Sequence, residues 1–386
     1  MITESKLLDR KILRKGYRYD QNLIWVVVLM TAFSMMMIYS ASVAYAGHDG
    51  GSQWHYLTRQ MIFVGIGAVL AWVTATQVPM QLWKKATPAL LMISLTLLIV
   101  VLFGREINGA KRWIALGPFN VQPSEVFKLT TILYLASFFT RRSEILRDLK
   151  KVWYVGLPVV IGLFLLMMEP DFGSTVVASA IFLGLVYLAG LPLKWFGIIV
   201  SVSVIGMGAL IVMAPYRMAR ITSFLDPFED PMGKGYQLAH ALMAIARGEW
   251  FGVGLGASLE KRFYLPEAHT DFILAVIAEE FGFFGMLALI CCYAWLVLRA
   301  FSIGKQARDL ELYFSAFVAK GIGIWLGIQS FFNIGVNIGL LPTKGLTLPL
   351  MSYGGSAVIV MLVCMALLVR VDFENRQKMR GYKIEG

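Results

Sequence analysis

The stretch Arg262-Phe-Tyr-Leu-Pro-Glu-Ala-His-Thr-Asp271 runs without a break into the apolar segment Phe272-Ile-Leu-Ala-Val-Ile-Ala-Glu-Glu-Phe281. It places a carboxylate where a polar loop ends and a predicted membrane helix begins. The polar loop that ends before Asp271, residues 214–270, is rich in Arg, Lys, Asp, Gly and Pro. On both sides of that loop the chain is almost wholly apolar. We therefore interpret the rest of the molecule as a scaffold for this junction.

The composition indicates a membrane protein. Of the 386 residues, 58% are hydrophobic and only 15% are charged, and the apolar residues form repeated runs near the ~20 residues that cross a bilayer. The net charge is +11, but the basic residues lie in short clusters beside apolar runs, which argues against a nucleic-acid partner. Cys291, Cys292 and Cys364 have neither disulfide nor metal-ligand spacing. The sequence predicts an all-α polytopic membrane protein.

Ten apolar runs predict ten transmembrane helices. They lie near residues 23–43, 60–78, 86–103, 122–140, 153–168, 174–191, 193–213, 271–298, 312–336 and 353–371. The predicted organisation is a cytoplasmic N-terminal tail, a single ten-helix domain with a long outward loop between helices 7 and 8, and a cytoplasmic C-terminal tail. These parts span residues 1–21, 22–371 (with the loop at 214–270) and 372–386.

The distribution of Lys and Arg predicts the orientation. An even number of spans puts both ends of the chain on one side, and that side carries 22 of the 35 basic residues against 11 on the other. The remaining two, Lys128 and Lys320, lie within spans. Because basic loops stay in the cytoplasm, we expect both tails to be cytoplasmic and the loop 214–270 to face outward.

Two outward segments carry charges beside a span. A helix that starts at residue 123 places Glu125 and Lys128 one turn apart on the same face. This pair is interpreted either as a self-neutralising ion pair or as the lining of a polar cavity. The fifth and sixth spans are joined by a turn that contains Glu169 and Asp171. A turn does not require two carboxylates, so we assign both residues to a candidate site.

Three further features follow in the chain. Residues 236–247 are expected to form a short amphipathic helix at the interface. Within the eighth span, Glu279 is expected on the same cavity wall as Asp271, and Glu279 or Glu280 is the predicted partner of the intramembrane Lys320. The breaker-rich segment 333–357 predicts an irregular loop, which a membrane protein tolerates only where it is buried in protein or lines a water-filled cavity.

Four blocks together carry a family resemblance. Asn333 through Ala357, with Gly339-Leu-Leu-Pro-Thr-Lys-Gly-Leu-Thr-Leu-Pro349, resembles the signature of the SEDS family (shape, elongation, division and sporulation). Gln122-Pro-Ser-Glu125 with Lys128, Glu169-Pro-Asp171-Phe-Gly173 and Leu265-Pro-Glu-Ala-His-Thr-Asp271 match its other blocks in the expected order. The resemblance covers nearly the whole chain, and Lys344 is typical of the division branch rather than the elongation branch.

The resemblance implies a peptidoglycan glycosyltransferase that polymerises lipid II at the outer face of the bacterial cytoplasmic membrane, at the division septum. It identifies Asp271 as the catalytic carboxylate, a general base for glycosyl transfer. Cations are needed to neutralise the lipid diphosphate, and the candidates are Arg112, Arg217, Lys261 and Lys344. The other predicted substrate-binding residues are Glu125, Lys128, Glu169, Asp171, His269 and Ser352. No metal ligands are assigned, and the sequence leaves open whether a divalent cation such as Mg²⁺ or Mn²⁺ shares this task with Glu169 or Asp171.

Transport is the rival function, because intramembrane Glu279, Glu280 and Lys320 also suit a polar pathway for flipping lipid II. A non-catalytic organiser of the division machinery is a third interpretation. Against transport, the two halves of the chain show no clear repeat. The expected partners are lipid II, the growing glycan strand, membrane lipids, other division proteins and a class B penicillin-binding protein, since the chain has no transpeptidase domain of its own.

Overall fold

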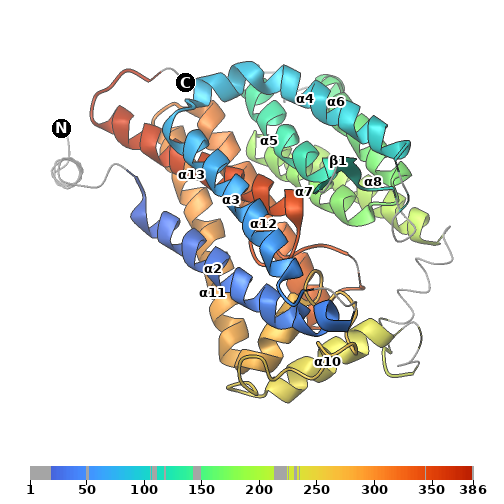
Figure 1. The fold of residues 1–386 in the computed structure, drawn as a ribbon. Coiled ribbons are helices and arrows are strands. Elements are labelled where there is room, and N and C mark those ends of the chain that lie inside the picture. The colour runs from blue at the N-terminus through green and yellow to red at the C-terminus, as the bar shows by residue number, and fades with distance from the viewer. Residues whose placement is uncertain are drawn as a thin grey trace.

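The structure of the chain is a computed structural model. The structure describes residues 19–48, 52–104, 106, 111–116, 119–141, 149–212, 224, 226–229, 233, 235–343 and 345–384. Helices account for most of these residues (Figure 1). The elements in chain order are α2 (Gln21–His48), α3 (His55–Thr76), α4 (Met80–Leu102), β1 (Ile114–Leu116), β2 (Phe119–Val121), α5 (Pro123–Arg141), α6 (Leu149–Met168), α7 (Phe172–Leu188), α8 (Leu193–Val212), α10 (Tyr236–Gly248), α11 (Ile273–Asp309), α12 (Tyr313–Asn337) and α13 (Gly355–Met379).

The long helices agree with a multi-pass membrane protein. Each of the ten predicted spans overlaps one of them, and the short helix expected at 236–247 is α10. Within the described part of the chain, six helices are long and apolar enough to cross a membrane: α2, α3, α4, α11, α12 and α13. The start of α2 and the end of α13 lie toward one end of the molecule, and α10 lies at the other (Figure 1).

A small β-hairpin departs from the all-α prediction. β1 and β2 pair antiparallel, with Ile114 opposite Val121. Two strands of three residues each are too short for an alternating pattern to stand out in sequence. The hairpin leads directly into α5 and so fixes where that helix begins.

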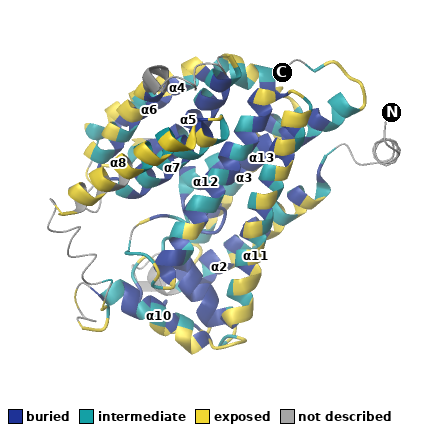
Figure 2. Ribbon diagram, turned by 180° about the vertical axis from the view of Figure 1, so that it is seen from behind, coloured by how far each residue is buried: buried dark blue, intermediate teal, exposed yellow. Residues whose placement is uncertain are grey.

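α12 and α13 form the centre of the bundle. α12 packs against α11, α5 and α7, and α13 lies along α3. In their apolar windows 67% and 72% of residues are buried, against 22–39% in the other four candidate spans. Figure 2 shows the same contrast, with α12 and α13 largely buried and α6 and α8 carrying exposed faces. Polar side chains on helices that are buried on all sides need hydrogen-bond partners within the protein.

A break in α11 joins it to the loop that follows α10. At Gly282 the backbone turns to φ 68°, a conformation that glycine adopts without strain. The amides of Val253 and Gly254 donate to the carbonyls of Glu279 and Glu280, at 2.9 and 3.1 Å. In return, residues 283 and 284 donate to the carbonyls of residues 249 and 250. The backbone groups freed by the break are thus satisfied by the loop.

The segment between α12 and α13 is irregular, as predicted. Several of its side chains are buried, among them Leu346, Leu348, Leu350 and Met351. Such backbone is stable inside a membrane protein because neighbouring helices supply its hydrogen bonds. The described residues of this segment, 338–343 and 345–354, lie against the candidate site.

Candidate active site

Asp271 lies two residues before the start of α11 at Ile273. Its backbone carbonyl accepts hydrogen bonds from the side-chain amides of Asn333 and Asn337, at 2.9 and 3.0 Å. Asn337 also accepts from the amide of Ala275 in the first turn of α11, at 3.1 Å. The helix N-cap position is occupied by Phe272. α12 therefore fixes the backbone of Asp271. The side chain of Asn337 also satisfies a backbone amide in the first turn of α11.

The irregular segment passes directly over the carboxylate of Asp271. A Cβ atom placed on Gly345 would lie 3.0 Å from Oδ2 of Asp271, so a larger residue there would crowd the carboxylate. The Ser352 hydroxyl donates to the carbonyl of Thr270 at 2.6 Å. The amide of Tyr353 donates to the carbonyl of His269 at 2.9 Å. The predicted residue Ser352 thus ties the two segments together beside Asp271.

His269, another predicted site residue, lies between two tyrosine rings. Its ring centroid is 4.7 Å from that of Tyr56 and 5.6 Å from that of Tyr353. Burial lowers the pKa of His269, and the nearby carboxylate of Glu267 partly opposes this shift. The neutral imidazole is therefore favoured, which suits packing and hydrogen bonding rather than a fixed positive charge.

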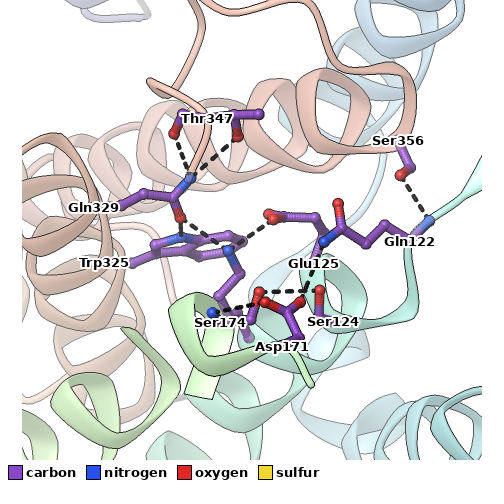
Figure 3. Close-up of polar contacts among 10 residues, drawn as sticks. Gln122, Ser124, Glu125, Asp171, Ser174, Trp325, Gln329, Thr347 and Ser356 are labelled. Carbon is purple, nitrogen blue, oxygen red and sulfur yellow. Dashed lines mark hydrogen bonds and ion pairs between the residues drawn. The ribbon is translucent and has the colours of Figure 1, made fainter. Parts of the chain in front are cut away.

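A buried polar network joins α5 to the irregular segment (Figure 3). The ammonium group of Lys128 lies 2.8 Å from Oε1 of Glu125 and 2.8 Å from Oε1 of Gln329. The indole of Trp325 donates to the same Gln329 oxygen, and the Gln329 amide donates to the carbonyl of Thr347 at 2.9 Å. Because Lys128 is fully buried, its charge is neutralised inside the protein, as the ion-pair interpretation predicted.

A small cavity adjoins this network. It is about 10 Å³ in volume and is lined by Glu125, Gln329, Thr347 and Ser352 among other residues. A space of roughly this size holds one water molecule when polar groups surround it. The cavity lies between the Glu125–Lys128 pair and the segment that covers Asp271.

The turn between α6 and α7 brings the predicted residue Asp171 close to the start of α5. Asp171 caps α7 by accepting from the amide of Ser174 at 3.2 Å. It also accepts from the side-chain amide of Gln122, at 3.4 Å. The hydroxyls of Ser174 and Ser124 lie 3.2 Å apart, and Figure 3 shows these residues grouped between the two helix starts. Asp171 has a structural task that a turn-and-cap pattern explains.

Arg112 and Glu169 are both neighbours of Pro170. The Arg112 guanidinium donates to the carbonyl of Pro170. Glu169 is 1% exposed, and within the described part of the chain neither of its carboxyl oxygens has a hydrogen-bond partner. Burial and the neighbouring Asp171 raise the pKa of Glu169 to about 8, although Arg112 acts in the opposite direction.

The predicted cation Lys261 lies in a second buried network. Its ammonium group is 2.6 Å from Oε1 of Glu280 and 2.8 Å from the hydroxyl of Ser40 in α2. The neighbouring Glu279 accepts from the Ser258 hydroxyl at 2.5 Å and from the amide of Leu259 at 2.9 Å. The structure thus assigns Lys261 to anchoring the loop before Asp271, and its contact with a diphosphate stays a prediction.

The predicted partnership of Lys320 with Glu279 or Glu280 is wrong. Glu279 is bound by Ser258, Leu259 and Arg247, and Glu280 is bound by Lys261 and Ser40. The side chain of Lys320 packs against Gly304 of α11. Three further positioning residues, Asn333, Asn337 and Gln329, were not predicted from the sequence. Polar amides at a spacing of four, inside an apolar span, are the signal that identifies them.

The predicted site residues form two groups around residues 345–352. Asp271, His269 and Ser352 lie on one side, and Glu125, Lys128, Asp171 and Glu169, with Arg112, belong to the other. Arg217 and Lys344 lie outside the described residues. Among the described residues, no group of three or more His, Cys, Asp or Glu side chains is arranged to hold a metal ion.

Comparison with known proteins identifies the family. Residues 20–377 match the cell cycle protein family FtsW/RodA/SpoVE. The chain belongs to this family. One FtsW/RodA/SpoVE relative is the probable peptidoglycan glycosyltransferase FtsW of Neisseria gonorrhoeae (strain NCCP11945), 56% identical over 98% of this chain and 90% of the relative. Another is the protein of the same name from Aromatoleum aromaticum, 51% identical over 94% of this chain and 90% of the relative.

Two solved structures share the FtsW/RodA/SpoVE fold. One, described as a peptidoglycan synthase complex that coordinates polymerization and crosslinking, aligns with a TM-score of 0.76 and 29% identity over 92% of this chain and 98% of that one. The other is the rod shape determining protein RodA of Thermus thermophilus, with a TM-score of 0.66 and 28% identity over 92% of this chain and 96% of that one.

Proposed function

We propose that this chain is a peptidoglycan glycosyltransferase that polymerises lipid II into glycan strands during septal wall synthesis, with Asp271 as its general base. Relatives that share about half of its residues are named as such enzymes. The observation that carries the assignment of Asp271 is its setting: α12 holds its backbone through Asn333 and Asn337, and glycine at position 345 leaves room beside its carboxylate.

The proposed reaction is a direct displacement. A sugar hydroxyl of the incoming lipid II attacks the anomeric carbon of the growing strand, and Asp271 accepts the proton of that hydroxyl. A new glycosidic C–O bond forms as the bond from the anomeric carbon to the diphosphate oxygen breaks, and the lipid diphosphate leaves. One base suffices for inversion, whereas glycosidases use two carboxylates.

The experiment that tests this function is polymerisation in detergent. The purified chain with its partner should convert lipid II into glycan strands in micelles, where no second membrane side exists. A flippase needs two sides, and a non-catalytic organiser makes no polymer. The pairing of Glu279 and Glu280 with loop residues also leaves little of a polar pathway for transport. Absence of polymer with every candidate partner would contradict the proposal.

The proposed topology is one domain, residues 22–371, with ten membrane-spanning helices and both tails in the cytoplasm of a bacterial inner membrane. The excess of basic residues on the tail side supports it, as does the position of α10 at the end opposite the start of α2. Cysteines introduced in the loop 214–270 should react with an impermeant thiol reagent once the outer envelope is permeabilised. Labelling of the tails instead would invert the orientation.

The proposed partner is a class B penicillin-binding protein that crosslinks the strands, together with other division proteins and membrane lipids. The solved complex that this chain resembles is described as coordinating polymerization with crosslinking, which supports such an assembly. For the diphosphate we propose Arg112, Arg217 and Lys344 as cations, with Lys261 and a divalent cation (Mg²⁺ or Mn²⁺) as alternatives that activity assays with chelators would test.

A further inference from the structure

The carboxyl group of Glu169 is buried without a partner. Its residue is 1% exposed, and both oxygens lack a hydrogen bond among the described residues. Burying an unpaired carboxyl group is unfavourable, and far more so when it is ionised. A side chain kept in this state at a helix junction therefore calls for a ligand that supplies the missing hydrogen bonds.

Among the described residues, the charged groups that act on Glu169 are Asp171 and Arg112. Asp171 belongs to the same turn, and its carboxylate is already engaged by the amides of Ser174 and Gln122. Arg112 is fixed on the carbonyl of Pro170, and its Nε–H is buried without a partner. In α5, the charges of Glu125 and Lys128 neutralise each other. Gly345 and Leu346, the described residues of the irregular segment that contact this turn, are uncharged.

The protonation state of Glu169 decides which ligand this site accepts. If Glu169 were ionised, the charges of the described residues Glu169, Asp171 and Arg112 would sum to −1, which disfavours phosphate and favours a cation. Burial raises the pKa of Glu169 to about 8, so the neutral acid predominates at pH 7. The site then offers two unused donors, the carboxyl O–H and the Nε–H of Arg112, which suits a phosphate oxygen.

The turn that carries Glu169 is adjacent to the reacting centre. A Cβ atom on Gly173 would lie 3.4 Å from the carbonyl oxygen of Gly345. On its other side, Gly345 lies against the carboxylate of Asp271. A single glycine thus separates the turn from the proposed general base, and a diphosphate at the turn would be close to the sugar whose bond to it breaks.

We propose that Glu169 is a neutral hydrogen-bond donor that, together with Arg112, binds a phosphate oxygen of the lipid-linked diphosphate. The inference rests on the proposed function and specifies the ligand chemistry of that same site. It differs from a divalent-cation site, which would require an ionised Glu169 and a free Asp171. The consequence is an alkaline limit: diphosphate binding weakens as Glu169 loses its proton.

The test compares the pH dependence of the wild type with that of Glu169→Gln, in the complete complex with its partner. KM for lipid II should rise about tenfold in the wild type between about pH 7 and pH 9, because a group with a pKa of about 8 loses about nine-tenths of its neutral form over that range. Glutamine keeps a donor and cannot ionise, so Glu169→Gln should lack this rise. Glu169→Leu should have a raised KM at every pH.

Glu249→Gln is the matched control, since Glu249 is an exposed carboxylate of the loop and its variant should retain the rise in KM. A rise that persists in Glu169→Gln, or a Glu169→Gln as impaired as Glu169→Leu, would overturn the proposal. If Glu169→Gln is as impaired as Glu169→Leu and regains activity at high Mg²⁺ or Mn²⁺, the site binds a cation instead.

Binding of undecaprenyl diphosphate to the same proteins in detergent separates this inference from the proposed function. Wild-type Kd should weaken about tenfold over the same pH range, and the Kd of Glu169→Gln should not. If the wild type makes no polymer, the proposed function fails, and this binding measurement still decides the role of Glu169. A Kd that does not change with pH in the wild type would overturn the inference even if polymerisation succeeds.

Discussion

Two buried lysine–glutamate pairs hold the candidate site, and they are built differently. Glu125 and Lys128 lie one turn apart on α5, and Gln329 extends their network to the carbonyl of Thr347. Lys261 and Glu280 are 19 residues apart in sequence, and their pair joins the loop before Asp271 to α11 and, through Ser40, to α2.

The difference between the pairs teaches how Asp271 is positioned. The α5 pair supports the irregular segment that passes over the carboxylate, whereas the α11 pair anchors the loop that ends at Asp271. The first pair would form in an isolated helix, but the second exists only in the assembled bundle. Lys128 and Lys261 thus each help to fix one of the two segments beside Asp271.

The largest effect on stability is expected for Lys261→Met. It would leave the Glu280 carboxylate buried, next to Glu279, with the Ser40 hydroxyl as its remaining donor among the described residues. Removing one partner of a buried ion pair typically costs about 3–5 kcal/mol. Unfolding by SDS titration in mixed micelles measures this loss, and polymerisation should fall with it because the loop before Asp271 loses its anchor.

The double variant Lys261→Met with Glu280→Gln is the control. It removes both charges and keeps a group that bonds to Ser40, so most of the lost stability should return. A single variant as stable as the wild type would show that the pair does not hold the loop.

A smaller loss is expected for Lys128→Met. Glu125 would lose its cation, but it lines the cavity that is large enough for a water molecule, and that water can hydrate the carboxylate. We expect a cost near the lower end of about 3–5 kcal/mol, measured by the same titration. A loss larger than that of Lys261→Met would reverse the comparison between the two pairs.

The sequence was sufficient to predict the helices and one of the two pairs. The apolar runs locate the long helices, each of which overlaps a predicted span, because a segment that suits a bilayer must be long and apolar. The pair of Glu125 with Lys128 follows from helical spacing. The pair of Lys261 with Glu280 does not, because it depends on how the loop folds back over the break at Gly282, and no local pattern encodes that path.

The sequence predicted which residues belong to the candidate site, but not which residues hold them in place. The carboxylate of Asp271 was identified from the family resemblance, but Asn333 and Asn337 of α12, which hold its backbone, were not. Long-range hydrogen bonds from one span to another depend on tertiary packing. The same reason explains why Lys320 was given the wrong partner.

The substitution Asp271→Asn tests the central claim, that Asp271 is a general base held in place by its surroundings. Its effect on stability should be the smallest of the series, because the hydrogen bonds from α12 are accepted by the backbone carbonyl of Asp271 and asparagine has nearly the same shape as aspartate. Its effect on rate should be large, since loss of a general base costs on the order of 10²–10⁴. Glu267→Gln is the matched control, an exposed carboxylate of the same loop.

The decisive measurement is therefore the rate of lipid II polymerisation by the purified Asp271→Asn complex, alongside its SDS titration. The account predicts unchanged unfolding and partner binding with a rate at least about 100-fold below that of the wild type, while Glu267→Gln stays within several-fold. Polymerisation by a folded Asp271→Asn complex at a near wild-type rate would contradict it and move the search for the base to Glu267, Glu169 or Asp171.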